Sequence, residues 1–223
     1  MPSISAIIIA RNEERHLPRL IQRLGEMPQV KQIILSDGGS TDATISIARN
    51  AGARVVSGQG RGAQLNAGAK AAKGEILWFL HADCLPARSC GAQMMASVGR
   101  GDVGGHFRVR FDSPSIWARV FERIARVQAH LGIFYGDSGI WSTQQAFEQL
   151  GGFQDWPLFE DLDFARRLRK VGRVETLAGR LRVSSRRFDR RPMRTLGLWL
   201  ELQIRWELGQ SPELLARLYR ERF

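Results

Sequence analysis

Three carboxylates lie within four positions, at Glu160, Asp161 and Asp163. Apolar residues recur around them at helical spacing, which puts the acids in the first turn of a predicted helix. Carboxylates this close repel one another, so solvent, arginines or a metal must offset their charge. Two interpretations follow: the helix dipole favours acids at a helix start, or one of these carboxylates is a general base.

Three further polar segments, residues 11–14, 37–42 and 81–83, each come directly after an apolar run typical of a buried strand. The middle segment also reads as a glycine turn into a capped helix. Three polar loops at neighbouring strand ends nevertheless favour a ligand site. Their candidate binding side chains are Arg11, Glu13, Asp37, His81 and Asp83.

The elements that would position these loops alternate between strand and helix patterns. Strands are predicted at residues 4–10, 32–36, 53–57 and 75–80, and helices at 13–25, 41–51 and 62–72. Such alternation indicates an α/β fold with a mostly parallel sheet and helices on both faces. Ligands bind beyond the carboxyl ends of such strands, so the three polar loops are expected to converge there.

The pattern changes after residue 100. We expect a strand at 103–111, a helix at 116–131, a turn at 136–139, a short helix at 144–150 and short strands around Val174 and Val183. No long linker appears, which predicts one domain over residues 1–183 and a basic, amphipathic helical extension over 184–223. The side chains of the 116–131 helix expected to face inward are Ile116, Val120, Phe121, Ile124, Val127 and Leu131.

The 223 residues are 43% hydrophobic and 25% charged, as in an ordinary globular protein, with a net charge of +11. Residues 166–223 hold 16 Lys and Arg against 6 Asp and Glu, so most of this charge lies there. That excess indicates an anionic partner: a phosphate-bearing ligand, an acidic membrane surface or nucleic acid. Two cysteines, no signal peptide and no apolar run of ~20 residues predict a cytoplasmic protein, with peripheral contact to the inner face of the membrane left open.

Two common nucleotide-binding plans are excluded. A dinucleotide-binding domain needs a glycine-rich turn directly after the first strand, where this chain has residues 11–13 (RNE), and a P-loop is absent as well. The missing phosphate loop also argues against a nucleotidyltransferase.

Five motifs in order resemble the family 2 glycosyltransferases, which have the GT-A fold. They are residues 9–14 (IARNEE), 37–42 (DGGSTD), 61–68 (RGAQLNAG), 80–83 (LHAD) and 151–153 (GGF) followed by Glu160-Asp161. Together they span about residues 4–172. The chain departs from the family pattern at Ile9, where proline is common, and at His81, where a second acid is common. Residues 81–83, 61–64 and 184–188 are most similar to the bacterial arsenosugar-biosynthesis and selenodomain-associated group.

The resemblance implies transfer of a sugar from a nucleotide-diphosphate donor, UDP-type favoured, to an acceptor hydroxyl with inversion. It implies a divalent cation, Mn²⁺ or Mg²⁺, held by Asp83 with His81, although His81 also fits a simple strand-end residue. Asp161 would be the general base, with Glu160 or Asp163 as alternatives. The residues implied to contact the nucleotide sugar are Arg11, Glu13, Asp37, Arg61, Gln64 and Asp83.

On the acceptor side we place Asp137, Trp156, Glu160 and Arg187. Asp137 also fits a plain turn, and Trp156 fits either a sugar-stacking wall or a core plug. Arg187 belongs to a cluster of arginines over 186–194 that would help neutralise phosphate charge.

A rival hypothesis is a non-catalytic, basic nucleotide- or nucleic-acid-binding protein, for which the same arginines would be the contact. The basic run lies beside an apolar segment and lacks interleaved base-stacking aromatics, so nucleic acid is not expected as a partner. The Trp-bearing segment 196–208 is too short and too charged to span a bilayer. Residues 195–223 would instead contact an anionic membrane surface, pack on the domain or form a homodimer.

Overall fold

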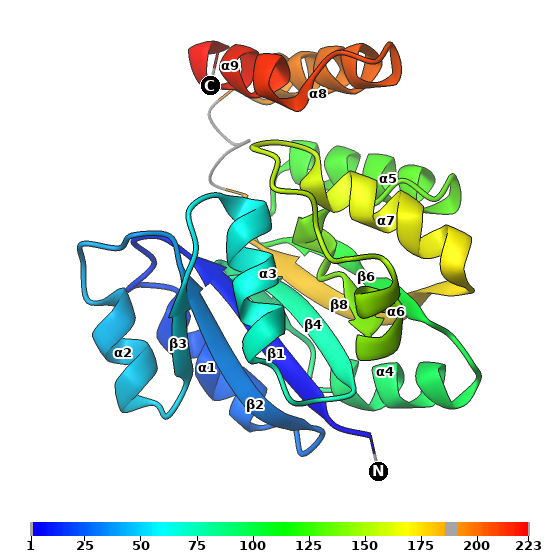
Figure 1. Cartoon of the computed structure of the whole chain (residues 1–223). Helices are drawn as coiled ribbons and strands as arrows, with labels where there is room; N and C mark the ends of the chain where they lie inside the picture. Colours follow the sequence, from blue (N-terminus) through cyan, green and yellow to red (C-terminus); the bar gives the residue numbers. More distant parts are fainter. Residues whose placement is uncertain (1, 186–190, 223) are drawn as a thin grey trace.

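The computed structural model of the chain describes residues 2–185 and 191–222. Within these residues, eight strands form one sheet in the order β3-β2-β1-β4-β7-β6-β8-β5 (Figure 1). The strands are β1 (Ile4–Ala10), β2 (Val30–Asp37), β3 (Arg54–Ser57), β4 (Ile76–His81), β5 (Cys84–Pro86), β6 (Gly104–Phe111), β7 (Trp141–Thr143) and β8 (Val174–Val183). The predicted α/β class is confirmed.

Helices cover both faces of the sheet, as predicted. They are α1 (Leu17–Gly25), α2 (Thr44–Asn50), α3 (Arg61–Ala71), α4 (Cys90–Gly99), α5 (Ile116–His130), α6 (Gln144–Gln149), α7 (Glu160–Val171), α8 (Pro192–Glu207) and α9 (Pro212–Arg222), with the short 3-10 helix η1 (Gly136–Ser138). Because successive strand residues point to opposite faces, the side chains of β1 contribute to two hydrophobic cores, one on each face of the sheet. Ile4, Ala6 and Ile8 pack with α1 and α4, whereas Ile7 and Ile9 pack with α3, α6 and α7.

The sheet has a parallel half and a mixed half. Strands β3, β2, β1 and β4 are all parallel neighbours, which is what the strand–helix alternation of the first hundred residues predicts. In the second half β7 runs antiparallel to both β4 and β6, β8 is parallel to β6, and β5 is antiparallel to β8. The carboxyl ends of β1, β2 and β4 therefore share one edge.

The C-terminal helices α8 and α9 form a hairpin that lies over the start of α7 (Figure 1). A small apolar cluster joins Phe159 and Leu162 to Leu198, Leu202 and Leu215 of the hairpin. Packing of the extension on the domain, one of the expected alternatives, is therefore present. The domain boundary near residue 183 stays a prediction.

The structure differs from the sequence-based predictions in three places. The two short strands expected around Val174 and Val183 are one continuous strand, β8. The segments α4, β5 and β7 were not predicted, because each is short or lacks a clear apolar period. On α5 and at its C-cap the expected inward face is only partly buried: Phe121 is buried, whereas Ile116, Val127 and Leu131 are exposed and do not line the cavity.

Candidate active site

The polar loops after β1, β2 and β4 meet at one edge of the sheet, as predicted. In the parallel register Ala10 of β1 lies beside Asp37 of β2, and Ile9 lies beside His81 of β4. Two strands that flank β1 thus present a carboxylate and an imidazole within one strand spacing of its end. This is the crevice where ligands bind in open α/β sheets.

Asn12 ties the first two loops together. Its backbone has φ 56°, in the left-handed region that asparagine tolerates. Its side-chain Oδ1 accepts a hydrogen bond from the Thr41 backbone N–H at 2.8 Å, and its own N–H donates to Ser40 Oγ at 2.9 Å. Asp42 caps α2 by accepting from the Thr44 N–H at 3.0 Å, so this acid serves the helix start. Arg11 is exposed beside this junction, and the neighbouring Glu13 N–H donates to Thr44 Oγ1 at 2.8 Å.

Asp37 is a buried carboxylate with one oxygen in use and one available. Its Oδ2 accepts from the backbone N–H groups of Gly39 at 2.8 Å and Ser40 at 3.0 Å. The residue is only 4% exposed, and its buried Oδ1 has no hydrogen-bond partner among the described residues. A buried carboxylate oxygen costs free energy unless a donor reaches it, so this atom fits a ligand N–H or O–H.

Helix α3 brings Arg61 and Gln64 to the same edge. Gln64 Nε2 donates to two strand-end carbonyls, Ala10 at 3.2 Å and Ser36 at 3.1 Å, so its amide nitrogen holds β1 and β2 together. A Cβ on Gly38 would lie 2.6 Å from that nitrogen, so a larger residue here would displace the Gln64 amide. Arg61, at the first position of α3, lines the large cavity described below.

The start of α7 places Asp161 opposite His81. Phe159, which precedes the helix, has φ 65°, a strained conformation for an aromatic residue that the surrounding packing must enforce. Asp161 Oδ2 then accepts a hydrogen bond of 2.6 Å from the backbone N–H of Gly136 in η1. A Cβ on Gly136 would lie 3.0 Å from His81 Nε2 and 3.2 Å from Asp161 Oδ2. The imidazole and the carboxylate therefore both lie close to the same point beside Gly136.

Glu160 points into the protein, away from solvent. It is 2% exposed, and its Oε2 has no hydrogen-bond partner among the described residues. Burial, reinforced by the negative charge of Asp161 and opposed by Arg61, raises the pKa of Glu160 to about 8. The carboxyl is therefore largely protonated at neutral pH, and the repulsion expected between adjacent acids is relieved by neutralising one of them.

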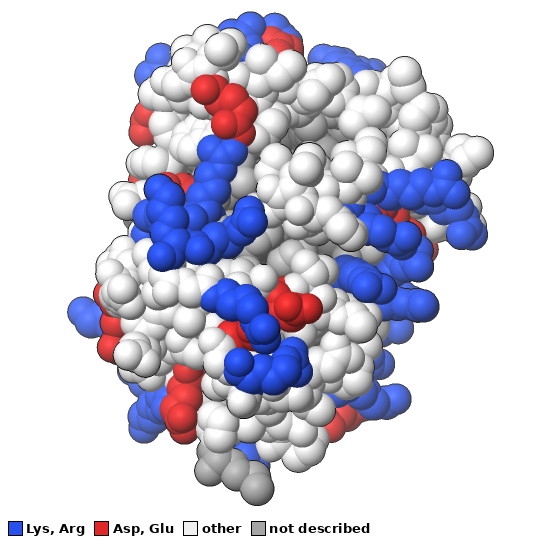
Figure 2. All heavy atoms as spheres, turned by 90° about the vertical axis from the view of Figure 1, so that its right-hand side faces the viewer, with Lys and Arg blue, Asp and Glu red and all other residues white. Residues whose placement is uncertain are grey.

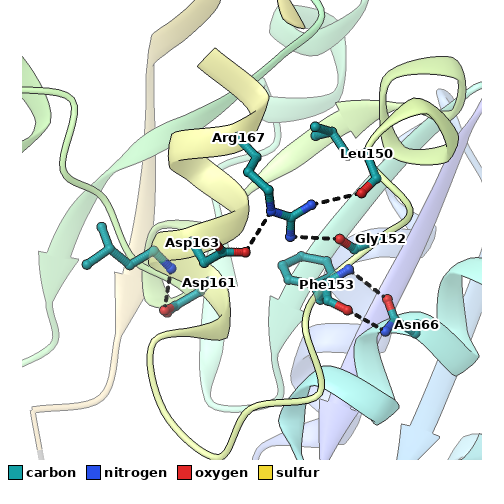
Figure 3. Close-up of polar contacts among 8 residues, drawn as sticks. Asn66, Leu150, Gly152, Phe153, Asp161, Asp163 and Arg167 are labelled. Atoms are coloured by element: carbon teal, nitrogen blue, oxygen red, sulfur yellow. Dashed lines mark hydrogen bonds and ion pairs between the residues drawn. The ribbon is translucent and has the colours of Figure 1, made fainter. Parts of the chain in front are cut away.

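Asp163 has a structural partner in Arg167, one turn later on α7 (Figure 3). The Arg167 Nε lies 2.7 Å from Asp163 Oδ2, while its two terminal nitrogens donate to the carbonyl oxygens of Leu150 and Gly152, both at 2.9 Å. Asp163 also does not line either cavity found at this site. Of the three acids at the start of α7, Asp161 is the one that faces the large cavity.

A cavity of about 920 Å³ extends from this edge. At one end its lining includes the candidate residues Arg61, His81, Asp83, Asp137 and Asp161. Asp137 lies within the turn of η1 and also lines the cavity, so the two interpretations of this residue are compatible. The cavity thus joins some of the predicted donor-side and acceptor-side residues in one space, whereas Arg11, Glu13, Asp37 and Gln64 do not line it.

The residues present suit a divalent cation shared with a phosphate ligand. His81 ends β4 and Asp83 follows it, and both line the cavity. No group of three or more His, Cys, Asp or Glu side chains suited to a metal occurs in residues 2–185 and 191–222. Mg²⁺ and similar ions are commonly held by one or two protein ligands together with substrate phosphates and water, so a pair of donors fits such an ion only alongside a diphosphate.

The other two residues predicted on the acceptor side are Trp156 and Arg187. Trp156 lies against Trp206 of α8, with ring centroids 5.4 Å apart in an edge-to-face arrangement, and it does not line the cavity. The structure therefore favours the packing alternative for Trp156. Arg187 lies outside the described residues.

Three residues of the site escaped the sequence analysis. Gly136 supplies the N–H that orients Asp161, but its motif reads only as a turn. Tyr135 donates its hydroxyl to Gln203 of α8, which depends on a contact across 68 positions of sequence. His106 stacks on Phe134 with ring centroids 4.1 Å apart, and alternation within a strand gave no sign that it would line a cavity.

Comparison with known proteins gives the family to which this α/β chain belongs. Residues 5–151 match the model of glycosyl transferase family 2, so the chain belongs to that family.

Among solved structures, the chain is similar to S. aureus TarS 1–349, with a TM-score of 0.65, 17% identity, and coverage of 82% of this chain and 60% of that one. It is also similar to glucosyl-3-phosphoglycerate synthase from Mycobacterium tuberculosis, with a TM-score of 0.52, 22% identity, and coverage of 66% and 58%. These likenesses show the GT-A fold.

Among curated proteins, a 53-residue stretch is 47% identical to 4,4'-diaponeurosporenoate glycosyltransferase of Staphylococcus haemolyticus. That stretch is 24% of this chain and 14% of the relative. The chain thus spans only part of the length of each of these proteins.

Proposed function

We propose that this chain transfers a sugar from a UDP-type nucleotide sugar to an acceptor hydroxyl, with inversion at the anomeric carbon. The observation that carries the proposal is that Asp161 and His81 both lie close to Gly136 and both line the cavity. A transferase needs a base for the acceptor and a charge-stabilising group for the leaving diphosphate within one space, and these two side chains suit those two tasks.

On the donor side, the unpartnered Oδ1 of Asp37 is suited to accept a hydrogen bond from uracil N3–H or from a ribose hydroxyl. Arg61, at the N-terminal end of α3, would balance phosphate charge. Arg11 and Glu13 remain proposed contacts at the rim of the loop after β1. The amide nitrogen of Gln64 already serves strand-end carbonyls, so we assign Gln64 to holding the loops in place.

On the acceptor side, Asp161 accepts the proton of the attacking hydroxyl. The acceptor oxygen forms a bond to the anomeric carbon as the bond from that carbon to the diphosphate oxygen breaks, and the nucleoside diphosphate leaves with the electron pair. Gly136 N–H fixes one oxygen of Asp161, and the neutral form of Glu160 leaves Asp161 as the charged member of the adjacent pair. General bases of this kind typically contribute ~10²–10⁴ in rate.

Asp83 and His81 would hold a divalent cation together with the donor diphosphate. When bound, such a cation supplies Lewis-acid stabilisation of the charge that develops on the leaving group. The similar M. tuberculosis synthase has been crystallised with Mn²⁺ and UDP, and S. aureus TarS 1–349 with UDP-GlcNAc, which supports a nucleotide-sugar donor here.

Calorimetric titration with UDP, with and without Mn²⁺, tests the donor site. We expect UDP to bind more tightly with Mn²⁺, and Asp83→Ala to weaken UDP only when the metal is present, because that carboxylate acts through the cation. EDTA should reproduce the effect in the wild type. Equal UDP affinity under all these conditions would show that the site works without a metal, and absence of UDP binding under all of them would refute the proposed function.

A further inference from the structure

The cavity extends well beyond the groups that the chemistry of transfer requires. From Asp161 and His81 it runs between α5, the β6–β8 part of the sheet and the C-terminal helix α8. Its volume of about 920 Å³ lies near the upper end of the ~300–1,000 Å³ typical of small-molecule sites. The α8–α9 hairpin contributes to its wall, so the C-terminal extension is part of the site.

Part of the wall formed by α5 and α8 is apolar. Phe121, Ile124 and Ala125 line the cavity from α5, and Leu196 and Trp199 line it from α8. Phe121 and Trp199 meet edge to face, with centroids 5.6 Å apart, and this contact joins the two helices beside the cavity. Water in contact with such walls is unfavourable, so this part of the cavity favours a ligand with an apolar surface.

The polar side chains in the lining do not turn these walls into a site for a polar ligand. Arg110 is paired with Glu122, and Arg108 and Arg180 are exposed. His106 is buried, and burial lowers its pKa to about 4, so its ring is neutral at pH 7. The polar residues that α5 adds to the lining, Arg126, Gln128 and His130, are exposed or only partly buried.

The cavity also reaches the exposed surface through α8. Leu200 lines the cavity and is nevertheless 60% exposed. It belongs to a row of exposed apolar residues at helical spacing on α8, with Met193, Ile204 and Leu208. The exposed apolar surface of α8 thus meets the cavity lining at Leu200.

We propose that the acceptor is an amphiphile, whose apolar body lies between α5 and α8 while its hydroxyl reaches Asp161. The proposal rests on the transferase function given above and specifies its acceptor class. It does not depend on a particular lipid, because the walls select for apolar surface and the carboxylate selects for a hydroxyl at one end.

Tryptophan quenching by ω-bromo alcohols of 6, 8 and 11 carbons tests this assignment, since bromine quenches indole on contact and the probes carry the required hydroxyl. The apparent Kd should fall about fourfold for each added methylene, which corresponds to ~0.8 kcal/mol per buried CH₂. Trp199→Phe should remove most of the quenching. Ala125→Phe, which fills the cavity, should weaken the 11-carbon probe at least tenfold.

Val127→Phe is the matched control, because Val127 lies on the same helix but is 61% exposed and outside the cavity lining. It should leave probe affinity unchanged, and UDP affinity measured with Mn²⁺ should be unchanged in all three variants. Affinity independent of chain length, or equal loss in the Ala125 and Val127 variants, would overturn the amphiphile assignment while leaving the donor site standing. If the probes bind but UDP does not bind at all, the proposed transferase function fails, and the acceptor role of the cavity fails with it.

Discussion

The three acids at the start of α7 show how one cluster of charge is divided among different tasks. Asp163 pairs with Arg167, Glu160 holds a proton, and Asp161 faces the cavity while one of its oxygens accepts from the Gly136 N–H. Sequence spacing could not separate these roles, because all three occupy one helical turn. The side of the helix on which each lies decides the matter, and that depends on the strained backbone of Phe159.

The raised pKa of Glu160 predicts a pH-dependent stability. The folded chain keeps this proton up to about pH 8, whereas the unfolded chain loses it near 4.5, so the free energy of unfolding falls as pH rises between these values. Glu160→Gln, which mimics the protonated form, should remove this loss. Relative to the wild type it should gain roughly 2–4 kcal/mol between pH 5 and pH 8.

Urea unfolding at pH 5 and pH 8 measures that difference. Glu148→Gln, a change at an exposed glutamate on α6, serves as the control and should leave the pH profile of the wild type unaltered. If the Glu160 variant and the wild type lose stability in parallel over this range, Glu160 is ionised in the folded protein.

At the scale of elements, the sequence foretells the parallel half of the sheet far better than the rest. Each of its strands and helices is a local pattern, and the convergence of loops on the β1 edge follows from topology alone. The C-terminal wall of the cavity depends on α5, α8 and η1 meeting across long sequence separations. The expected inward face of α5 fails for this reason: Val127 and Leu131 have the period of buried residues but no element covers them.

The contacts of Arg167, here called the Arg167 clamp, predict how much this residue stabilises the position of α7. It joins Asp163 to the carbonyl oxygens of Leu150 and Gly152 in a partly buried setting (Figure 3). Arg167→Met should lower the free energy of unfolding by about 1–3 kcal/mol, since it leaves a carboxylate and two carbonyls without their donor.

Arg166→Met is the comparison, because the Arg166–Glu207 pair is largely exposed and such pairs contribute at most ~1 kcal/mol. Urea unfolding of both variants decides between them. Equal small effects would mean that solvent replaces the Arg167 contacts and that the clamp does not stabilise α7.

At the scale of the whole molecule, the surface carries both basic clusters and exposed apolar residues. Lys and Arg side chains form several clusters over the face at the right-hand side of Figure 1, where α5 and α7 lie (Figure 2). The arginines of α5 at 119, 123 and 126 are exposed, as are the apolar side chains of α8 at 193, 200, 204 and 208. Among the described residues no helix is both long and apolar enough to cross a bilayer.

We therefore predict reversible binding to anionic membrane surfaces. Basic residues near such a surface contribute ~1 kcal/mol each, and the exposed row on α8 would add apolar contact. Co-sedimentation should show binding to vesicles with acidic phospholipid at low salt, with loss at high salt and little binding to neutral vesicles. Absence of binding to acidic vesicles at low salt would rule out this membrane role. The exposed apolar row on α8 would then be assigned to contact with a second copy of the chain.

The central claim is that Asp161 is the base of a nucleotide-sugar transferase. Its most direct test is turnover of a UDP-sugar by Asp161→Asn, measured with saturating acceptor and alongside calorimetric binding of UDP with Mn²⁺. The amide cannot take the proton, so turnover should fall by ~10²–10⁴ while UDP affinity stays within about twofold. Wild-type turnover by Asp161→Asn would contradict the account and return the role of base to another residue.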